Sequence, residues 1–287
     1  MTSVALDACL CLLLISAAGV TVTSVPPQDS DRDRADAVAQ TLAATTAQVD
    51  YSLRPVPHRA NESDSGSGEA TNPEYDRTAH GTLASLLARA AVRTVRVDGE
   101  ALTGTNAGFA AAVRTAVRER LPPRTQIVVS FRPYPGSHLG RELRIGPTPP
   151  PNADVNAATV NPPSGVSALA RPNATGQQPG FDGLGQRVAS ALVEGLFPPE
   201  KARLALAGDP PVDRLVRHRY ARASSLYGVD TREAVAAGDT RTANERLAAA
   251  MGEQVASELR ARFPTPTTAA DSLRLDTVNI AVRTWST

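Results

Sequence analysis

Residues 127–145 read IVVSFRPYPGSHLGRELRI, and this stretch decides the fold. Apolar side chains alternate with smaller or polar ones from Ile127 to Phe131, as expected for a strand with one buried face. The same alternation returns over residues 139–145, and the PYPG sequence at 133–136 between them is a turn signal. The stretch therefore predicts two antiparallel strands and a sheet.

The segments on either side of this hairpin predict further elements. Upstream, apolar spacing predicts a helix over 83–91, a strand over 95–97 and a helix over 109–121. The Ala-rich segment 35–49 also has helical spacing. At the other end of the chain, residues 277–285 alternate like a strand that returns to the sheet.

The longest apolar ladder lies near the C-terminus. Its members recur every fourth residue, as on one face of a helix, and are Leu247, Met251, Val255, Leu259 and Phe263. Pro264 ends this helix. The same spacing places Glu258 on the solvent side.

An apolar stretch at residues 3–25 precedes all of these elements. It is about as long as a bilayer core is thick, and its only charged residue is Asp7. In one reading it is a retained transmembrane helix, with Asp7 either reaching water at the interface or pairing with a cation of a neighbouring subunit. In the other it is a cleaved signal, with Ser16 and Ala18 before the cut, although the positive start of a signal peptide is missing.

These patterns together predict an α+β protein. Residues 1–27 would form a single transmembrane helix, and 28–287 an extracytoplasmic domain with a small, mostly antiparallel sheet and several packed helices. Within that domain, residues 58–72 and 146–180 are expected to be loops, the second with one edge strand around 155–160.

Composition limits both the core and the partners. Aromatic residues make up only 4% of the 287, so the core is built from Ala, Val and Leu. A formal net charge of +1 provides no global field for nucleic acid, which we do not expect as a partner. Both cysteines, Cys9 and Cys11, lie in the apolar stretch. The Asn-x-Ser/Thr sequons at Asn61 and Asn173 are candidate glycosylation sites, which an exported domain could use.

Few residues stand out as a candidate site. Arg214, Arg217 and Arg222 recur at helical spacing and could bind an anionic partner, or they could form a solvated face paired with acids such as Asp213. The four histidines lack metal-ligand spacing, and no nucleophile or phosphate-loop motif is present. We therefore expect no catalytic residue, no metal and no cofactor. These three expectations rest on motifs alone.

The opening residues 2–14, TSVALDACLCLLL, resemble the N-termini of a haloarchaeal, pilin-like, membrane-anchored family of unknown function. Its members tend to be encoded with type IV pilus or tight-adherence type secretion components. The resemblance implies a single-pass protein of the cell membrane, with its C-terminal domain outside and pilin-like or secretion subunits as partners. It also implies that Asp7 neutralises a neighbouring subunit during assembly. The chain lacks the Lys/Arg-Gly cleavage site of archaeal prepilins.

The expected function is an accessory, minor pilin-like component of a surface filament or secretion apparatus, and not an enzyme. Two alternatives remain open at this point. One is an exported hydrolase with an unrecognised site, and the other is a surface protein that binds a glycan or peptide through its arginine-rich helix.

The length of the apolar stretch generates the first prediction. If the anchor is retained, the protein stays in the membrane pellet after a carbonate wash, and its N-terminus is Met1 or Thr2. Fractionation followed by N-terminal sequencing checks this. A mature protein found in the medium and beginning near Gly19 would contradict it.

Overall fold

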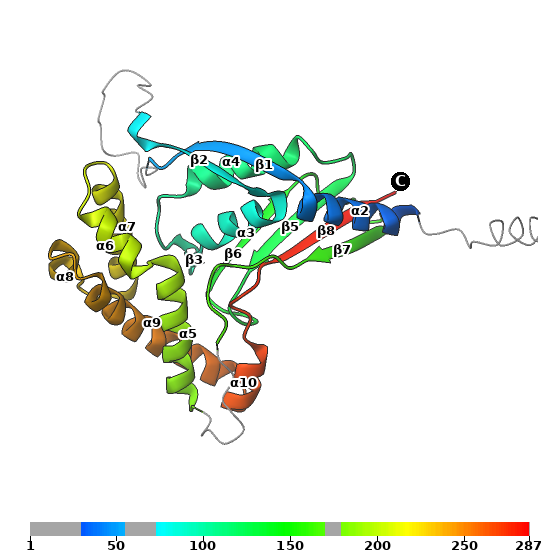
Figure 1. Ribbon diagram of the computed structural model, residues 1–287. Helices are drawn as coiled ribbons and strands as arrows, with labels where there is room; N and C mark the ends of the chain where they lie inside the picture. Colours follow the sequence, from blue (N-terminus) through cyan, green and yellow to red (C-terminus); the bar gives the residue numbers. More distant parts are fainter. Residues whose placement is uncertain (1–29, 55–72, 170–178, 287) are drawn as a thin grey trace, which may run out of the picture.

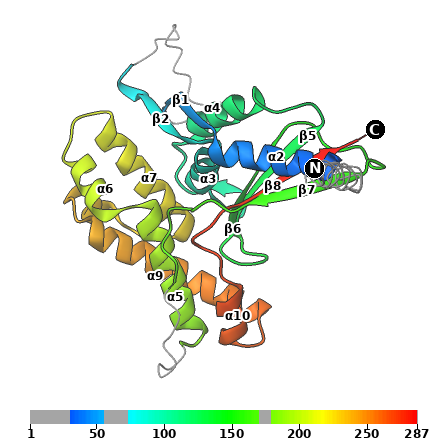
Figure 2. The same ribbon diagram turned by 45° about the vertical axis from the view of Figure 1, so that its right-hand side comes forward.

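The computed structural model describes residues 30–54, 73–169 and 179–286. They form two units that lie side by side in Figures 1 and 2. The sheet unit contains residues 30–54, 73–169 and 279–286, and the helical unit contains residues 179–272.

The sheet unit holds three α-helices and all the strands of the described residues. The helices are α2 (Ser30–Ala44), α3 (Leu83–Arg93) and α4 (Ala107–Arg118). The first four strands are β1 (Thr46–Ser52), β2 (Asp76–Thr82), β3 (Arg96–Val97) and β4 (Glu100–Ala101). The others are β5 (Thr125–Phe131), β6 (Leu139–Ile145), β7 (Val155–Val160) and β8 (Asn279–Trp285). A 3-10 helix, η1 (Pro73–Tyr75), precedes β2.

The six-stranded sheet has the order β4-β3-β6-β5-β8-β7, and all its pairs are antiparallel. The predicted hairpin is confirmed, with Ile127 opposite Ile145 in the β5–β6 register. The predicted C-terminal strand is also confirmed, since β8 pairs with β5 on one side and with β7 on the other. The strand around 155–160 lies at the sheet edge, as expected. The described residues therefore confirm the α+β class with antiparallel sheets.

One face of the sheet carries the core of the sheet unit. Val129, Leu143 and Ile280 point to this face and are buried, because α3 packs on β5 and β6. The helix α2 packs on β7 and β8 beside it (Figure 1). On the opposite face, Glu142 and Arg283 are exposed. The alternation seen in the sequence is thus the alternation between helix-covered and open faces.

The predicted helix over 35–49 is too long, because α2 ends at Ala44 and β1 begins at Thr46. In β1, Ala47 and Val49 are buried while their neighbours are exposed, which is the period of a strand. Pairing with β2 makes this strand, since Val49 lies opposite Ala79 in the two-stranded sheet. The β-branched residues at 45 and 46 also favour the change from helix to strand.

The helical unit contains the helices between β7 and β8. They are α5 (Phe181–Leu196), α6 (Pro199–Leu206), α7 (Val212–Tyr227), α8 (Arg232–Ala236), α9 (Thr240–Arg262) and α10 (Pro266–Ser272). The helices α5 and α9 pack closely because glycine faces glycine. A Cβ added at Gly185 would lie 2.5 Å from the carbonyl oxygen of Gly252.

The predicted ladder on α9 is confirmed for Leu247, Met251, Val255 and Leu259, which are all buried. Its last member, Phe263, follows the end of the helix and is half-buried. The expectation for Glu258 is wrong. Its half-buried carboxylate accepts hydrogen bonds from the Tyr134 hydroxyl at 2.8 Å and the backbone N–H of His138 at 3.2 Å. The loop between β5 and β6 covers this side of α9.

The predicted transmembrane segment, 1–27, and the predicted loop over 58–72 lie outside the described residues. Within the ranges that the structure describes, no helix combines the length and the apolar character needed to cross a bilayer.

The buried ladder generates the second prediction. Leu259→Ala opens a cavity beneath α9, where the side chain is fully buried, and such truncations cost about 2–5 kcal/mol. We expect the melting temperature of the purified protein to fall by at least about 4 °C. Thermal denaturation followed by circular dichroism checks this.

The matched control is Glu253→Ala on the same helix, because Glu253 is exposed. It should leave the melting temperature within about 1 °C, as surface substitutions usually do. Equal effects of the two substitutions would contradict the packing of α9.

Candidate functional site

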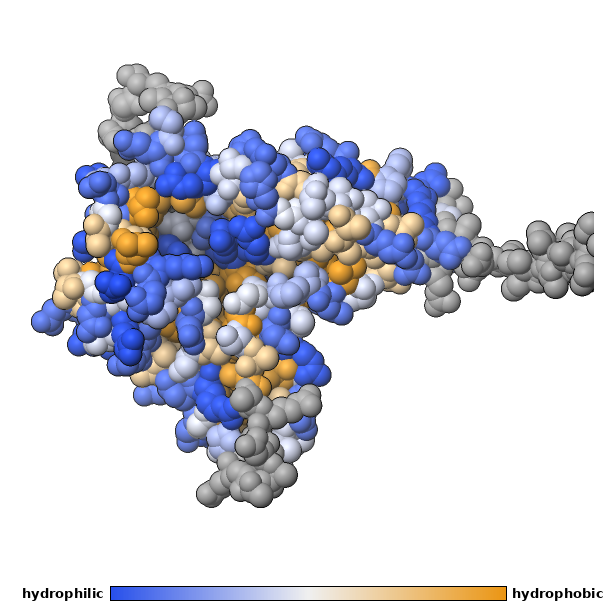
Figure 3. Space-filling view, viewed as in Figure 1, coloured by the Kyte–Doolittle hydropathy of each residue, from blue (hydrophilic) through white to orange (hydrophobic). Residues whose placement is uncertain are grey.

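A cavity of about 610 Å³ lies where the two units meet. The sheet unit contributes β1, β2, α3 and the loop before α4, and the helical unit contributes the end of α5 together with α6 and α7. Figure 3 shows a hollow between the units, bordered by both hydrophobic and hydrophilic residues. We call this cavity the inter-unit pocket.

Among the described residues, basic side chains line the inter-unit pocket and acidic ones do not. Among its described lining residues are Arg77, Arg89, Arg93, Lys201 and Arg219, and no Asp or Glu. None of these five makes an ion pair with another described residue. In a chain of net charge +1, this is a strong local excess of positive charge.

Two of the arginines are held in place by one aromatic ring. Arg89 and Arg93 are one helical turn apart on α3, and their guanidinium carbons lie 5.5 and 5.4 Å from the centre of the Phe109 ring. Phe109 is fully buried. Burial, and then the charge of Arg93, lower the pKa of Arg89. Stacking thus fixes two like charges close together.

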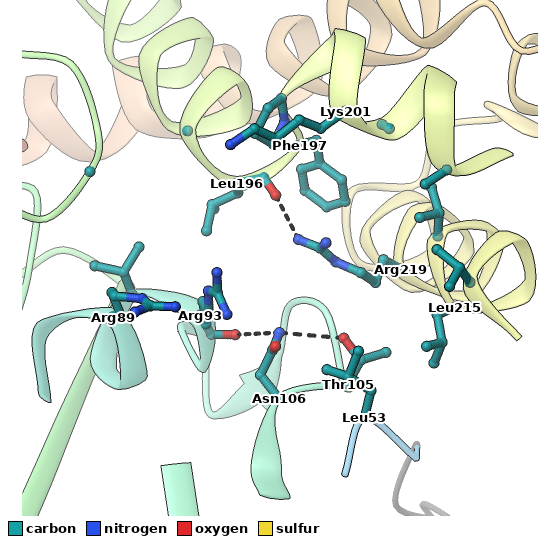
Figure 4. A pocket seen from close by; sticks show the side chains of 18 of the residues that line it. Leu53, Arg89, Arg93, Thr105, Asn106, Leu196, Phe197, Lys201, Leu215 and Arg219 are labelled. Carbon is teal, nitrogen blue, oxygen red and sulfur yellow. Dashed lines mark hydrogen bonds between the residues drawn. The ribbon is translucent and has the colours of Figure 1, made fainter. Parts of the chain in front are cut away.

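Arg219 reaches into the pocket from α7, on the other side (Figure 4). Its Nη2 donates a hydrogen bond to the carbonyl of Leu196 at 2.6 Å, and its guanidinium stacks on Phe197 at 5.3 Å. The side chain as a whole is half-buried, but its Nε is buried and has no partner among the described residues. Burial first, and then the charge of Arg93, lower the pKa of Arg219 to about 10, so it stays charged at neutral pH.

A polar edge on the sheet side supports Arg93. The Asn106 side-chain amide donates to the carbonyl of Arg93 and to the Thr105 hydroxyl, both at 3.3 Å (Figure 4). Asn106 and Thr105 are buried in the loop before α4. These bonds tie the end of α3 to the loop before α4.

The wall from the helical unit is mostly apolar. Its apolar residues include Leu196 and Phe197 at the end of α5, Ala202 on α6, and Leu215 and Val216 on α7. In Figure 4 the labelled arginines of α3 lie to one side of the pocket, Leu215 lies to the other, and Arg219 extends between them. The pocket therefore has a cationic end at α3 and a mostly apolar end at α6 and α7, which also carries Lys201 and Arg219.

Polar contacts between the units keep the two walls in position. Arg222 of α7 donates to the carbonyl of Ala101 at 3.0 Å and to the carboxylate of Glu100 at 3.3 Å. On another side, the Glu258 carboxylate accepts from the Tyr134 hydroxyl. The pocket lies between units that are already bonded to each other.

The arginines predicted as a binding face do not line this pocket. Arg214 is exposed, and Nε of Arg217 lies 3.8 Å from a carboxylate oxygen of Asp213. Arg222 bonds to the sheet unit, as described above. The structure therefore spreads the three over different surroundings. Asp7, Asn61 and Asn173 lie outside the described residues.

Sequence reasoning missed the arginine of α7 that does enter the pocket. A signal was present in the spacing, because Arg219 follows Leu215 by four residues and precedes Ala223 by four, and both are buried. It thus occupies the apolar face of an amphipathic helix. A charged residue at such a position is rarely buried without a partner or a function.

Groups that could carry other chemistry are placed differently. The Ser137 hydroxyl is buried in the β5–β6 loop and accepts from the N–H of Leu139 at 3.2 Å, so it orders the loop. His138 Nδ1 lies 2.8 Å from Asp98 in a largely exposed pair. Within the described ranges, His, Cys, Asp and Glu form no group of three that could hold a metal ion.

The cluster of arginines without an ion pair to a described carboxylate generates the third prediction. Because like charges repel in the ligand-free pocket, raising NaCl from about 10 to 150 mM shortens the screening length from about 30 to 8 Å and should raise the melting temperature. Arg93→Met keeps the contact with Phe109 and should reduce this salt dependence. Thermal denaturation at several salt concentrations measures both slopes.

Arg118→Met is the control, since it removes the same charge from an exposed site on α4. Its salt dependence should match that of the unmodified protein. If all three proteins give the same slope, the pocket holds no significant repulsion.

Comparison with known proteins gives a family but no activity. No curated protein matches the chain, and no solved structure matches it. A family model does match, over residues 6–285, which include most of the apolar stretch and both units. The chain therefore belongs to the family described as "Family of unknown function (DUF7284)".

Proposed function

We propose that this protein binds a small anionic ligand in the inter-unit pocket, at the cell surface, where its N-terminal apolar stretch anchors it. The observation that carries the proposal is the group of cationic side chains without a carboxylate among the described residues around them. The pocket volume of about 610 Å³ is typical of a small-molecule site.

The energetics of the arginines support binding over a purely structural role. A buried guanidinium without a carboxylate destabilises the folded protein, and two that repel each other do so more strongly. The proximity of Arg93 and Arg219 therefore costs stability in the ligand-free protein. An anion between them would offset both positive charges.

The form of the pocket limits the ligand. Guanidinium groups bind carboxylates and phosphates through paired hydrogen bonds, so the ligand carries one of these groups. Several cations converge, which favours more than one negative charge. A cavity of this size holds one small molecule or the end of a larger one.

The layout of the chain supports the proposed location. Only residues 26–29 separate the apolar stretch from α2, which packs on β7 and β8. In Figures 1 and 2, α2 begins at the side of the sheet unit that is away from the helical unit. An anchor there would leave the inter-unit pocket facing away from the membrane. The family match also includes residues 6–25 of the apolar stretch, which is consistent with a segment that is retained in the mature protein.

This proposal develops the alternative of a surface binding protein. The role of a minor pilin-like or secretion component, with Asp7 pairing to a neighbouring subunit, stays a prediction. An anion-binding domain is compatible with such an accessory role. The hydrolase alternative stays open as well.

The fourth prediction tests anion binding in the full-length protein. Pyrophosphate and citrate should raise the melting temperature in a saturable way, and more than NaCl does at equal ionic strength. A ligand at 100 times its dissociation constant stabilises by about 2.7 kcal/mol, which is several degrees. Arg219→Met and Arg93→Met should each abolish most of this increase.

Arg214→Met is the matched control, because it removes an exposed arginine from the same helix. It should keep the full response. If no anion stabilises the protein beyond its ionic strength, or if Arg214→Met and Arg219→Met respond alike, the proposed function is wrong.

A further inference from the structure

We propose that the ligand of the inter-unit pocket is amphiphilic: a phosphate monoester whose head group lies among Arg89, Arg93 and Arg219 and whose apolar chain lies against α6 and α7. This inference rests on the proposed function and adds the chemical class of the ligand to it.

The cationic end favours phosphate over a single carboxylate. Arg89 and Arg93 approach from α3, and Arg219 approaches from α7 (Figure 4). A carboxylate has two oxygens and one charge, so it neutralises one guanidinium at a time. A phosphate monoester has three free oxygens and nearly two charges at neutral pH, so it can accept from guanidinium groups on both sides of the pocket.

The wall formed by α6 and α7 carries few polar groups among its described residues. On α6 and α7, the described lining residues other than Lys201 and Arg219 are Ala202, Ala205, Val212, Leu215, Val216 and Tyr220. The Tyr220 hydroxyl is already bonded to the side-chain oxygen of Asn244 at 2.7 Å. Tyr220 therefore presents only its ring to the pocket.

This wall discriminates between classes of phosphate ester. The hydroxyl groups of a sugar phosphate or nucleotide would lose water against these side chains without gaining hydrogen bonds, which is unfavourable. An alkyl or prenyl chain loses nothing and gains the burial of its methylene groups. The apolar wall thus favours a phosphate carried by a hydrocarbon chain.

The test compares inorganic phosphate with ethyl, butyl and hexyl phosphate on the full-length protein by isothermal titration calorimetry. Each added methylene that enters the pocket should strengthen binding about two- to fourfold. Hexyl phosphate should therefore bind at least tenfold more tightly than inorganic phosphate. Hexanol, hexanoate and ribose 5-phosphate are the comparison ligands, and each should bind more weakly than hexyl phosphate.

Variants place the chain in the pocket. Val216→Thr keeps the side-chain shape but adds a hydroxyl to the half-buried wall, so it should reduce the gain from the hexyl chain and leave inorganic phosphate binding within about twofold. Leu204→Thr also puts a hydroxyl in place of aliphatic carbon, with a shorter side chain, at a residue of α6 that is 74% exposed, and it should have no effect. Arg93→Met should weaken both ligands.

The outcomes separate this inference from the proposed function. If phosphate binds and alkyl chains add nothing, or if ribose 5-phosphate binds more tightly, the amphiphile is wrong and anion binding stands. If hexanoate binds as tightly as hexyl phosphate, the assignment of a phosphate head group is wrong. If Leu204→Thr and Val216→Thr act alike, the chain does not occupy the pocket. If no anion binds at all, the proposed function fails together with the inference.

Discussion

The hydrogen bonds that β8 makes to both β5 and β7 hold the C-terminal residues inside the sheet, next to its edge strand β7. Because β8 is the last strand, everything between β7 and β8 has to leave the sheet and return to it. The helical unit is this excursion, and both of its ends are tied to neighbouring strands. Because β8 lies between β5 and β7, the helical unit has to lie beside the sheet unit, and the inter-unit pocket forms between them.

Within that constraint, the two units are built differently. The helical unit is closely packed around Gly185 and Gly252, where the absence of side chains lets α5 and α9 approach each other. The sheet unit packs α2 and α3 on one face of the sheet. The contacts between the units include polar ones, such as the hydrogen bonds of Arg222 and Glu258. Two firm walls joined in this way leave a cavity between them.

The positive charges in the inter-unit pocket lower the stability of the ligand-free protein and favour the binding of an anion. Stacking on Phe109 and Phe197 keeps three guanidinium groups in place although no described carboxylate neutralises them. Residues that lower the stability of the fold are typical of binding sites, where function and not folding requires them. The same stacking means that little side-chain freedom is lost when a ligand arrives, which favours affinity.

Local periodicity was enough to determine the β5–β6 hairpin, the ladder of α9 and the strand β8, because each has a spacing that reports which side is buried. The sequence by itself also shows the apolar stretch at 3–25 and contains none of the catalytic motifs that we looked for. Tertiary structure decided that residues 46–49 form a strand, since β2, the strand that pairs with them, comes later in the chain. It likewise decided that Arg219, rather than Arg214, Arg217 or Arg222, lines the pocket with Arg93. Helical spacing groups residues of one helix, but the surroundings of each depend on packing between segments far apart in sequence.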